Sequence, residues 1–202
     1  QLHALLAAEL AGLFGAVHLL PFFDPIDGAD AGFDPADHTR VDPRLGGWAD
    51  IEALTRDVDV VADLIVNHIS SDSFQFQDFL RNGRASPYAE MFLGFDKVFP
   101  HGASERELLA VFRQSATLPF TVTTLPNGER RVLWTTFTSR QIDIDVESPA
   151  GQAYLDGILE TLSRHGVRMV RLDAVGYAIK RAGSSCFLVP ETYAFVDRLV
   201  AR

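Results

Sequence analysis

The stretch VRMVRLDAVGY, residues 167–177, decides the fold of this chain. Its first six residues are mostly apolar and predict a strand that ends directly before Asp173. The preceding segment starts with Ser148-Pro149, a pair typical of a helix N-terminus, and ends with Gly166, a common helix stop. A helix followed by a strand with a carboxylate at its end is one repeat of parallel α/β architecture.

Two further predicted strands lie toward the N-terminus. Residues 15–23 (GAVHLLPFF) and 58–66 (VDVVADLIV) are short, nearly continuous apolar runs, as expected of strands buried on both faces. Residues 2–13 and 48–54 have apolar side chains at helical spacing, and a last helix is expected over residues 190–202. The sequence therefore predicts an α/β chain with three parallel strands.

Polar residues follow each predicted strand. They are the long loop of residues 24–47, the pair Asn67-His68, and Asp173. In a (β/α)8 TIM barrel the loops after the strands form the active-site face, which favours a catalytic role for these positions. Because such a barrel needs eight strands, we expect a partial barrel that belongs to a longer protein. The chain also begins at Gln1 and not at methionine.

Residues 70–141 interrupt the alternation of strands and helices. This segment contains nine of the 15 phenylalanines of the chain, enough for a small aromatic core of its own. Ser104 and Glu107 have the spacing of a capping box, which predicts a helix start, and Asn127-Gly128 predicts a β-hairpin. We therefore expect a partial catalytic barrel at 1–69, an inserted α+β subdomain at 70–141, and the continued barrel at 142–202.

The composition excludes several function classes. The formal net charge of −9 disfavours nucleic acid as a partner, and no run of about 18 apolar residues predicts a membrane-spanning helix. Cys186, the single cysteine, has no disulfide partner within the chain, which indicates a reducing compartment such as the cytoplasm. The six histidines show no ligand spacing and the Asp-rich loop does not match an EF-hand, so we expect no metal and no cofactor.

Six segments of the chain, taken in order, closely resemble sucrose phosphorylases, a branch of the α-amylase superfamily. The resemblance covers essentially the whole chain. It implies that the predicted strands are strands two to four of the eight in a catalytic barrel, with the subdomain inserted after the third barrel strand. The six segments are GADAGFDPADHTRVDPRLG (28–46), DLIVNH (63–68), VFPHGAS (98–104), QIDID (141–145), RLDAVGY (171–177) and AGSSCF (182–187).

The resemblance implies a glycosyltransferase that passes a glucosyl group from sucrose to phosphate with retention of configuration. Retention uses two carboxyl groups about 5–5.5 Å apart, one as the nucleophile and the other as acid and base. The resemblance assigns the nucleophile to Asp173, and Arg171, two residues earlier, can keep this carboxylate ionised and oriented. An aspartate that only caps the next loop is the alternative.

The resemblance also implies that part of the machinery lies outside this chain. The family's acid/base glutamate and its third carboxylate are expected beyond Arg202, so we expect the segment alone to be inactive. For the longer parent we expect sucrose and phosphate as small-molecule partners and a homodimeric assembly. The alternatives are an α-glucosidase, a phosphorylase for another glucoside such as glucosylglycerate, or an inactive truncated remnant.

Five further residues match substrate-binding positions of the family, in addition to Arg171. The resemblance implies that His68 hydrogen-bonds the glucose 6-hydroxyl, that Asp30 grips the far edge of the ring, and that Phe33 is an aromatic platform. Phe137 and Gln141 match residues near the acceptor and fructosyl side. Structural alternatives stay open: a structural histidine after a strand, a turn-forming aspartate between glycines, and two core residues of the subdomain.

Three other aspartates have less specific patterns. Asp63 is expected to be structural, because it lies inside a predicted strand. Asp143 and Asp145 resemble a carboxylate pair, but the alternation of side chains in a short strand explains them equally well. The sequence therefore assigns no catalytic role to these three residues.

The resemblance further predicts weak phosphate binding. Sucrose phosphorylases usually carry a Tyr-Arg-Pro-Arg type loop here, whereas residues 112–115 read FRQS, so Arg113 is kept and Ser115 replaces the second arginine. One lost charge-assisted hydrogen bond corresponds to an affinity about ten- to a hundredfold weaker. Ser115→Arg in the full-length protein should therefore lower the phosphate concentration for half-maximal phosphorolysis. If that concentration and the fraction of hydrolysis are both unchanged, this loop does not bind phosphate.

Overall fold

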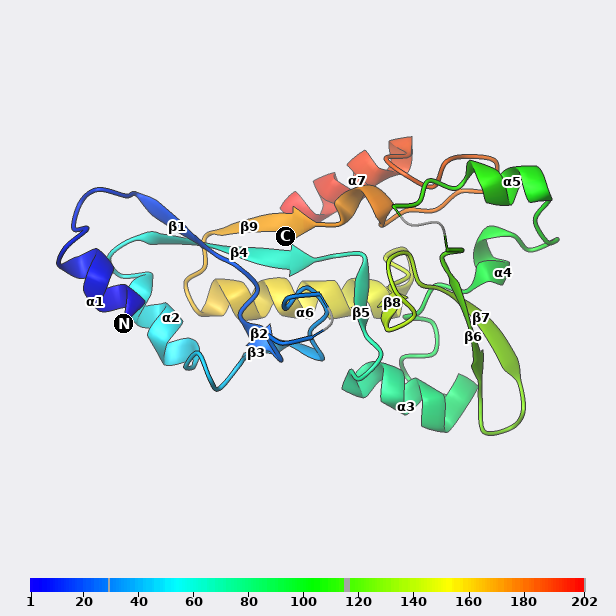
Figure 1. The fold of residues 1–202 in the computed structure, drawn as a ribbon, viewed down its shortest axis with the longest axis horizontal. Coiled ribbons are helices and arrows are strands. Elements are labelled where there is room, and N and C mark those ends of the chain that lie inside the picture. Colours follow the sequence, from blue (N-terminus) through cyan, green and yellow to red (C-terminus); the bar gives the residue numbers. More distant parts are fainter. Residues whose placement is uncertain (29, 115–116, 202) are drawn as a thin grey trace. The chain divides into compact units, whose positions relative to one another are not determined.

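The computed structural model describes residues 1–28, 30–114 and 117–201 (Figure 1). The chain forms two compact units. Helices and strands occur in both, which confirms the predicted α/β class. The first unit comprises Gln1–Leu64 and Gly157–Asp173, and the second unit comprises Ile65–Asp156 and Ala174–Arg202.

The first unit is built on a three-stranded sheet. Its strands, in spatial order, are β1 (Ala16–Leu19), β4 (Asp59–Ile65) and β9 (Met169–Asp173). β1 and β4 are parallel, and the arrows of β4 and β9 point the same way in Figure 1. The strands predicted from the apolar runs are therefore present and adjacent, and Asp173 is the last residue of β9.

The burial of β1 differs from the prediction that the runs 15–23 and 58–66 form strands covered on both faces. Val60, Ala62 and Leu64 of β4 are completely buried. Met169 of β9 is instead 43% exposed, and β1 is exposed at alternate residues. β1 and β9 are the outer strands, with no further hydrogen-bonded neighbour among the described residues, so less of the chain covers them. Burial on both faces is therefore confirmed for β4 and wrong for β1.

The helices of the first unit agree only in part with the prediction. α1 (Leu2–Ala7) is shorter than the predicted helix over residues 2–13, because turns follow it and Gly12 has a φ of 75°. α2 (Trp48–Leu54) forms as predicted. α6 (Pro149–Arg164), whose residues from Gly157 onward belong to the first unit, starts at the predicted Ser148-Pro149 pair. No helix in the described part of the chain is long and apolar enough to cross a membrane.

Gly166 ends α6 in a conformation that requires glycine. Its φ is 82°, and a Cβ at this position would lie 2.7 Å from Thr55 Oγ1. The neighbouring His165 stacks on Trp48 with a centroid distance of 4.3 Å, and its Nδ1 lies 2.6 Å from Glu52 Oε1. These contacts fix the end of α6 against α2, directly before β9.

The segment of residues 24–47 is more ordered than the predicted loop. β2 (Phe23–Asp24) and β3 (Asp37–Val41) pair antiparallel there. Phe23 and His38 are buried, with ring centroids 5.6 Å apart. The prediction of a loop without strands is therefore wrong for this segment. A strand of two residues, such as β2, shows no side-chain alternation by which the sequence could reveal it.

The second unit contains two small antiparallel sheets and several short helices. β5 (His68–Ser70) pairs with β8 (Gln141–Asp143), and β6 (Phe120–Thr124) pairs with β7 (Arg130–Trp134) in the predicted hairpin. The predicted capping box is confirmed at Ser104 and Glu107, before α5. The helices are α3 (Phe74–Asn82), η1 (Gly83–Ala85), α4 (Phe95–Val98), α5 (Glu105–Ala110), η2 (Val175–Tyr177) and α7 (Pro190–Val200).

The core of the second unit is rich in aromatic residues. Phe76, Phe79 and Phe92 contact one another through their rings. Cys186 is packed in another cluster, and burial raises the pKa of its thiol, so it stays neutral. That cluster consists of Leu93, Val98, Phe99, Val111, Trp134 and Cys186.

Candidate active site

Asp173 and Arg171 form an ion pair at the end of β9. Arg171 Nη1 lies 2.9 Å from Asp173 Oδ1. The two residues are two positions apart in the strand, so their side chains lie on the same face of the sheet. The Asp173 side chain is 17% exposed, which leaves it accessible while the guanidinium favours its ionised form.

Asp63 holds the other side of Arg171. This carboxylate in β4 is completely buried, and Arg171 Nη1 donates a hydrogen bond to its Oδ1. His18 Nε2 lies 2.9 Å from Asp63 Oδ2. Hydrogen bonding to Asp63, with the charge of Asp173 adding to it, raises the pKa of the Arg171 guanidinium. Arg171 is therefore a fixed cation shared by two carboxylates.

The sequence predicts a structural role for Asp63 but not its link to Asp173 through Arg171. A signal was present, because an aspartate in the buried run VDVVADLIV must find a partner for its charge. His18, in the apolar run GAVHLLPFF, gives the same signal. What the sequence does not contain is the pairing of β4 with β9, which brings Asp63 to Arg171.

Phe33 and Asp30 lie in the loop before β3. The Arg171 guanidinium carbon lies 5.8 Å from the centroid of the Phe33 ring, so Phe33 adjoins the ion pair. Asp30 is exposed, and its carbonyl accepts a hydrogen bond from the Phe33 N–H (2.8 Å). Its own N–H donates to the buried carboxylate of Asp34 (3.2 Å), which holds the turn. The structure thus brings Phe33 close to the Arg171 guanidinium.

Three predicted site residues of the second unit come together where β5 pairs with β8. His68 lies opposite Asp143 in the register of this pair. Gln141 Nε2 lies 3.1 Å from His68 Nε2, while Gln141 Oε1 accepts a hydrogen bond from Thr138. The amide therefore donates to His68, which assigns the histidine proton to Nδ1. The Phe137 ring packs edge-on against His68 at 5.1 Å.

Arg113 lies in the segment between α5 and β6. Its side chain makes no hydrogen bond or ion pair with any residue that the structure describes. The neighbouring Phe112 N–H donates to the Ser185 carbonyl (2.8 Å), which fixes the segment. Ser115, the position of the replaced arginine, lies outside the described residues.

Tyr177 is a further residue near the predicted site residues, and the sequence does not predict a role for it. Its ring centroid lies 5.1 Å from that of Phe137 and 4.7 Å from that of Phe187. Phe187 in turn packs on Phe112 at 4.6 Å. A continuous row of rings therefore joins His68 and Phe137 to the segment that carries Arg113. Tyrosine in RLDAVGY was visible in the sequence, but its non-local partners were not.

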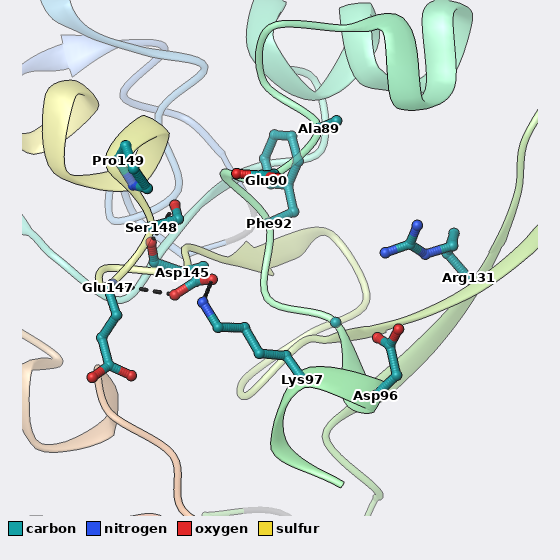
Figure 2. Close-up of a pocket in the computed structure, with 11 residues that line it drawn as sticks. Ala89, Glu90, Phe92, Asp96, Lys97, Arg131, Asp145, Glu147, Ser148 and Pro149 are labelled. Carbon is teal, nitrogen blue, oxygen red and sulfur yellow. Dashed lines mark hydrogen bonds and ion pairs between the residues drawn. The ribbon is translucent and has the colours of Figure 1, made fainter. Parts of the chain in front are cut away.

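The second unit also has a polar cavity of about 410 Å³ (Figure 2). Figure 2 shows Lys97 reaching Asp145, with which it forms an ion pair, and Arg131 lies 3.4 Å from Glu129. Both cations are thus already paired with carboxylates, so this cavity is a poor receptor for phosphate. Of the described residues that line it, none is a predicted site residue. Within the described residues, no group of three or more His, Cys, Asp or Glu is arranged to hold a metal ion.

The chain belongs to the α-amylase family, because the family model of the alpha amylase catalytic domain matches residues 12–192. It is 55% identical over 202 residues to the sucrose phosphorylase of Agrobacterium vitis, covering 100% of this chain and 41% of that relative. The sucrose phosphorylase of Bifidobacterium adolescentis is 47% identical over 195 residues, covering 96% and 38%. The crystal structure of sucrose 6F-phosphate phosphorylase from Thermoanaerobacter thermosaccharolyticum has a TM-score of 0.91 at 40% identity, covering 98% and 41%. The chain thus spans about two fifths of the length of these relatives.

Replacement of Asp63 tests the shared ion pair. Asp63→Asn should lower the free energy of unfolding by about 1.5–3 kcal/mol, because a buried hydrogen bond to a charged group is weakened. Asp59→Asn is a matched control on the same strand: Asp59 is 44% exposed and lies 3.5 Å from Arg168, so the loss should stay below about 1 kcal/mol. Equilibrium denaturation measures both variants, and equal losses would contradict a special role for Asp63.

Proposed function

We propose that the full-length protein containing this chain is a retaining glycosyltransferase of the phosphorylase type. It transfers the glucosyl group of sucrose to phosphate and yields α-glucose 1-phosphate and fructose. The observation that carries this proposal is Asp173, a carboxylate that ends a strand and is ion-paired with Arg171. The identity of 55% to a sucrose phosphorylase over the whole chain supports the choice of substrate.

The proposed architecture is a partial (β/α)8 barrel. β1, β4 and β9 would be its strands two to four, and residues 70–141 would be a subdomain inserted after the third barrel strand. Two observations support this: the strands neighbour one another in sequence order, and β1 and β4 are parallel. The C-terminal ends of barrel strands are where catalytic residues of this architecture lie, as proposed for Asp173.

The proposed reaction has two steps. In the first, an Asp173 oxygen attacks the anomeric carbon of the glucosyl group while the bond from that carbon to the fructosyl oxygen breaks. A glutamate, which the family resemblance assigns to a part of the protein outside this chain, protonates the leaving oxygen. In the second, phosphate attacks the same carbon and releases Asp173, so two inversions give net retention. Arg171 favours the ionised carboxylate in both steps.

Substrate-binding roles are proposed for residues of each unit. In the second unit, His68 bonds the glucose 6-hydroxyl, with Gln141 and Phe137 toward the acceptor. These proposed roles are supported by contacts among the three residues, because Gln141 and Phe137 hold the His68 ring in one orientation. In the first unit, Phe33 offers an aromatic platform and Asp30 grips the ring edge, roles that rest on the family resemblance.

Arg113 is the proposed cation for phosphate. A guanidinium suits a phosphate dianion, and among the described residues no carboxylate neutralises this one. The anchored Phe112 supports a fixed course of the backbone beside it. A homodimeric parent is also proposed from the family resemblance, and a cytoplasmic location from the single cysteine, Cys186.

A phosphorylase for a phosphorylated sucrose is the second candidate, because the solved relative at 40% identity is named for sucrose 6F-phosphate. The full-length protein should be incubated with sucrose or sucrose 6F-phosphate, with and without phosphate, and the products followed by NMR. The proposal expects α-glucose 1-phosphate from sucrose only when phosphate is present. Free glucose at the same rate without phosphate would indicate an α-glucosidase, and no turnover would indicate an inactive remnant.

Asp173→Asn in the full-length protein should lower kcat for sucrose phosphorolysis by roughly 10⁴-fold or more, the scale expected when a catalytic group is removed. The amide keeps the shape of the side chain but cannot attack the anomeric carbon. The exposed Asp59→Asn serves as the control and should keep wild-type turnover. If Asp173→Asn retains more than a small fraction of activity, the nucleophile has been assigned to the wrong residue.

A further inference from the structure

Lys180 is a buried cation in the loop that follows η2. Its side chain is only 1% exposed, and its Nζ is ion-paired with Asp143 and donates to Asn67 Oδ1 (2.9 Å). Nζ also lies 5.5 Å from the centroid of the Trp134 ring, within reach of a cation–π contact. Burying an ammonium costs several kcal/mol, and stability alone often favours apolar residues in such places. The burial of this lysine therefore points to a specific role.

The partners of Lys180 are themselves buried. Asp143 is fully buried and accepts hydrogen bonds from the N–H (2.9 Å) and the hydroxyl of Thr136. Asn67 is fully buried, and its Nδ2 has no hydrogen-bond partner among the described residues. The orientation of the Asn67 amide is thus set by its bond to Lys180.

Each group held by this network is next to a proposed substrate-binding residue. Asn67 directly precedes His68, and Asp143 lies opposite His68 in the β5–β8 register. Asp143 is two residues after Gln141, and Thr136, which it binds, directly precedes Phe137. Through Asn67 and Asp143, Lys180 therefore connects the chain segments that carry His68, Gln141 and Phe137.

We propose that Lys180 is a positioning residue for His68 and Gln141, which acts by orienting Asn67 and Asp143. It does not touch the substrate. The inference rests on the proposed function, in which His68 bonds the 6-hydroxyl of the glucosyl group. Loss of Lys180 should then weaken recognition of that one hydroxyl more than it weakens the reaction of a donor that lacks it.

The test compares two donors in the full-length protein: 4-nitrophenyl α-glucoside and its 6-deoxy analogue. The measured quantity is a ratio: kcat/KM for the glucoside divided by kcat/KM for the 6-deoxy analogue, each from release of nitrophenol. Lys180→Met removes the charge but leaves Asp143 buried without it, so Lys180→Met with Asp143→Asn is made as well to remove both charges together. We expect both variants to lower the ratio about tenfold, the loss of one well-placed hydrogen bond.

Lys97→Met is the matched control. Lys97 also pairs with a buried aspartate of the second unit, Asp145, but neither residue contacts His68, Gln141 or Phe137 through any hydrogen bond or ion pair of the described residues. The kcat/KM ratio of the Lys97→Met variant should equal that of the wild-type protein. A variant at Lys180 that is slower or less stable but keeps the wild-type ratio would overturn the positioning role and leave a structural one.

The role of Lys180 and the proposed function can be contradicted by different results. A wild-type protein that cleaves the aryl glucoside but does not form glucose 1-phosphate from sucrose contradicts the proposed function, while the ratio still decides the role of Lys180. A wild-type protein that shows no preference for the 6-hydroxyl overturns the positioning role, because there is then no contact to position. A protein that cleaves neither aryl donor and forms no glucose 1-phosphate from sucrose overturns both.

Discussion

The Arg171 guanidinium, shared between Asp63 and Asp173, is the interaction on which the candidate chemistry of the first unit depends. Arginine stays charged at every relevant pH, so it can favour the ionised carboxylate without itself titrating. The Asp63 side chain is fully buried, and its ion pair with Arg171 holds the guanidinium in place beside Asp173. Because Arg171 and Asp173 are on β9 and Asp63 is on β4, the pairing of these strands is a condition for the site.

The second unit also contains a buried carboxylate that holds a cation beside predicted site residues, but the cation there is a lysine. There a buried carboxylate, Asp143, holds a buried lysine, Lys180, beside the His68–Gln141 pair. Arg171 is half exposed, whereas Lys180 is almost fully buried. The half-exposed guanidinium of Arg171 is accessible to a ligand beside Asp173. The buried ammonium of Lys180 is accessible only to the residues packed around it.

The features that could be predicted from the sequence are those with a local cause. The Ser104 capping box, the Asn127-Gly128 turn and the stop at Gly166 depend on a few adjacent residues, and all are present. The position of Asp173 at a strand end was also readable from one short segment. The division into residues 1–69, 70–141 and 142–202 stays a prediction.

The remaining features depend on contacts between distant residues. The β5–β8 pairing joins His68 to a partner 73 residues away in Gln141, and Arg171 meets Asp63 across 108 residues. Neither distance leaves a periodic pattern in the sequence. A charged or polar residue inside an apolar strand, as at Asp63 and His18, is the one local sign that such a partner exists.

In the proposed mechanism Asp173 becomes covalently attached to the glucosyl group. The most direct measurement is to mix the full-length protein with sucrose in the absence of phosphate, quench it in acid, digest it, and locate the added hexose by mass spectrometry. The hexose is expected on Asp173, in the peptide that contains RLDAVGY. A hexose on another carboxylate, such as Asp143 or Asp145, or no covalent adduct during active turnover, would contradict it.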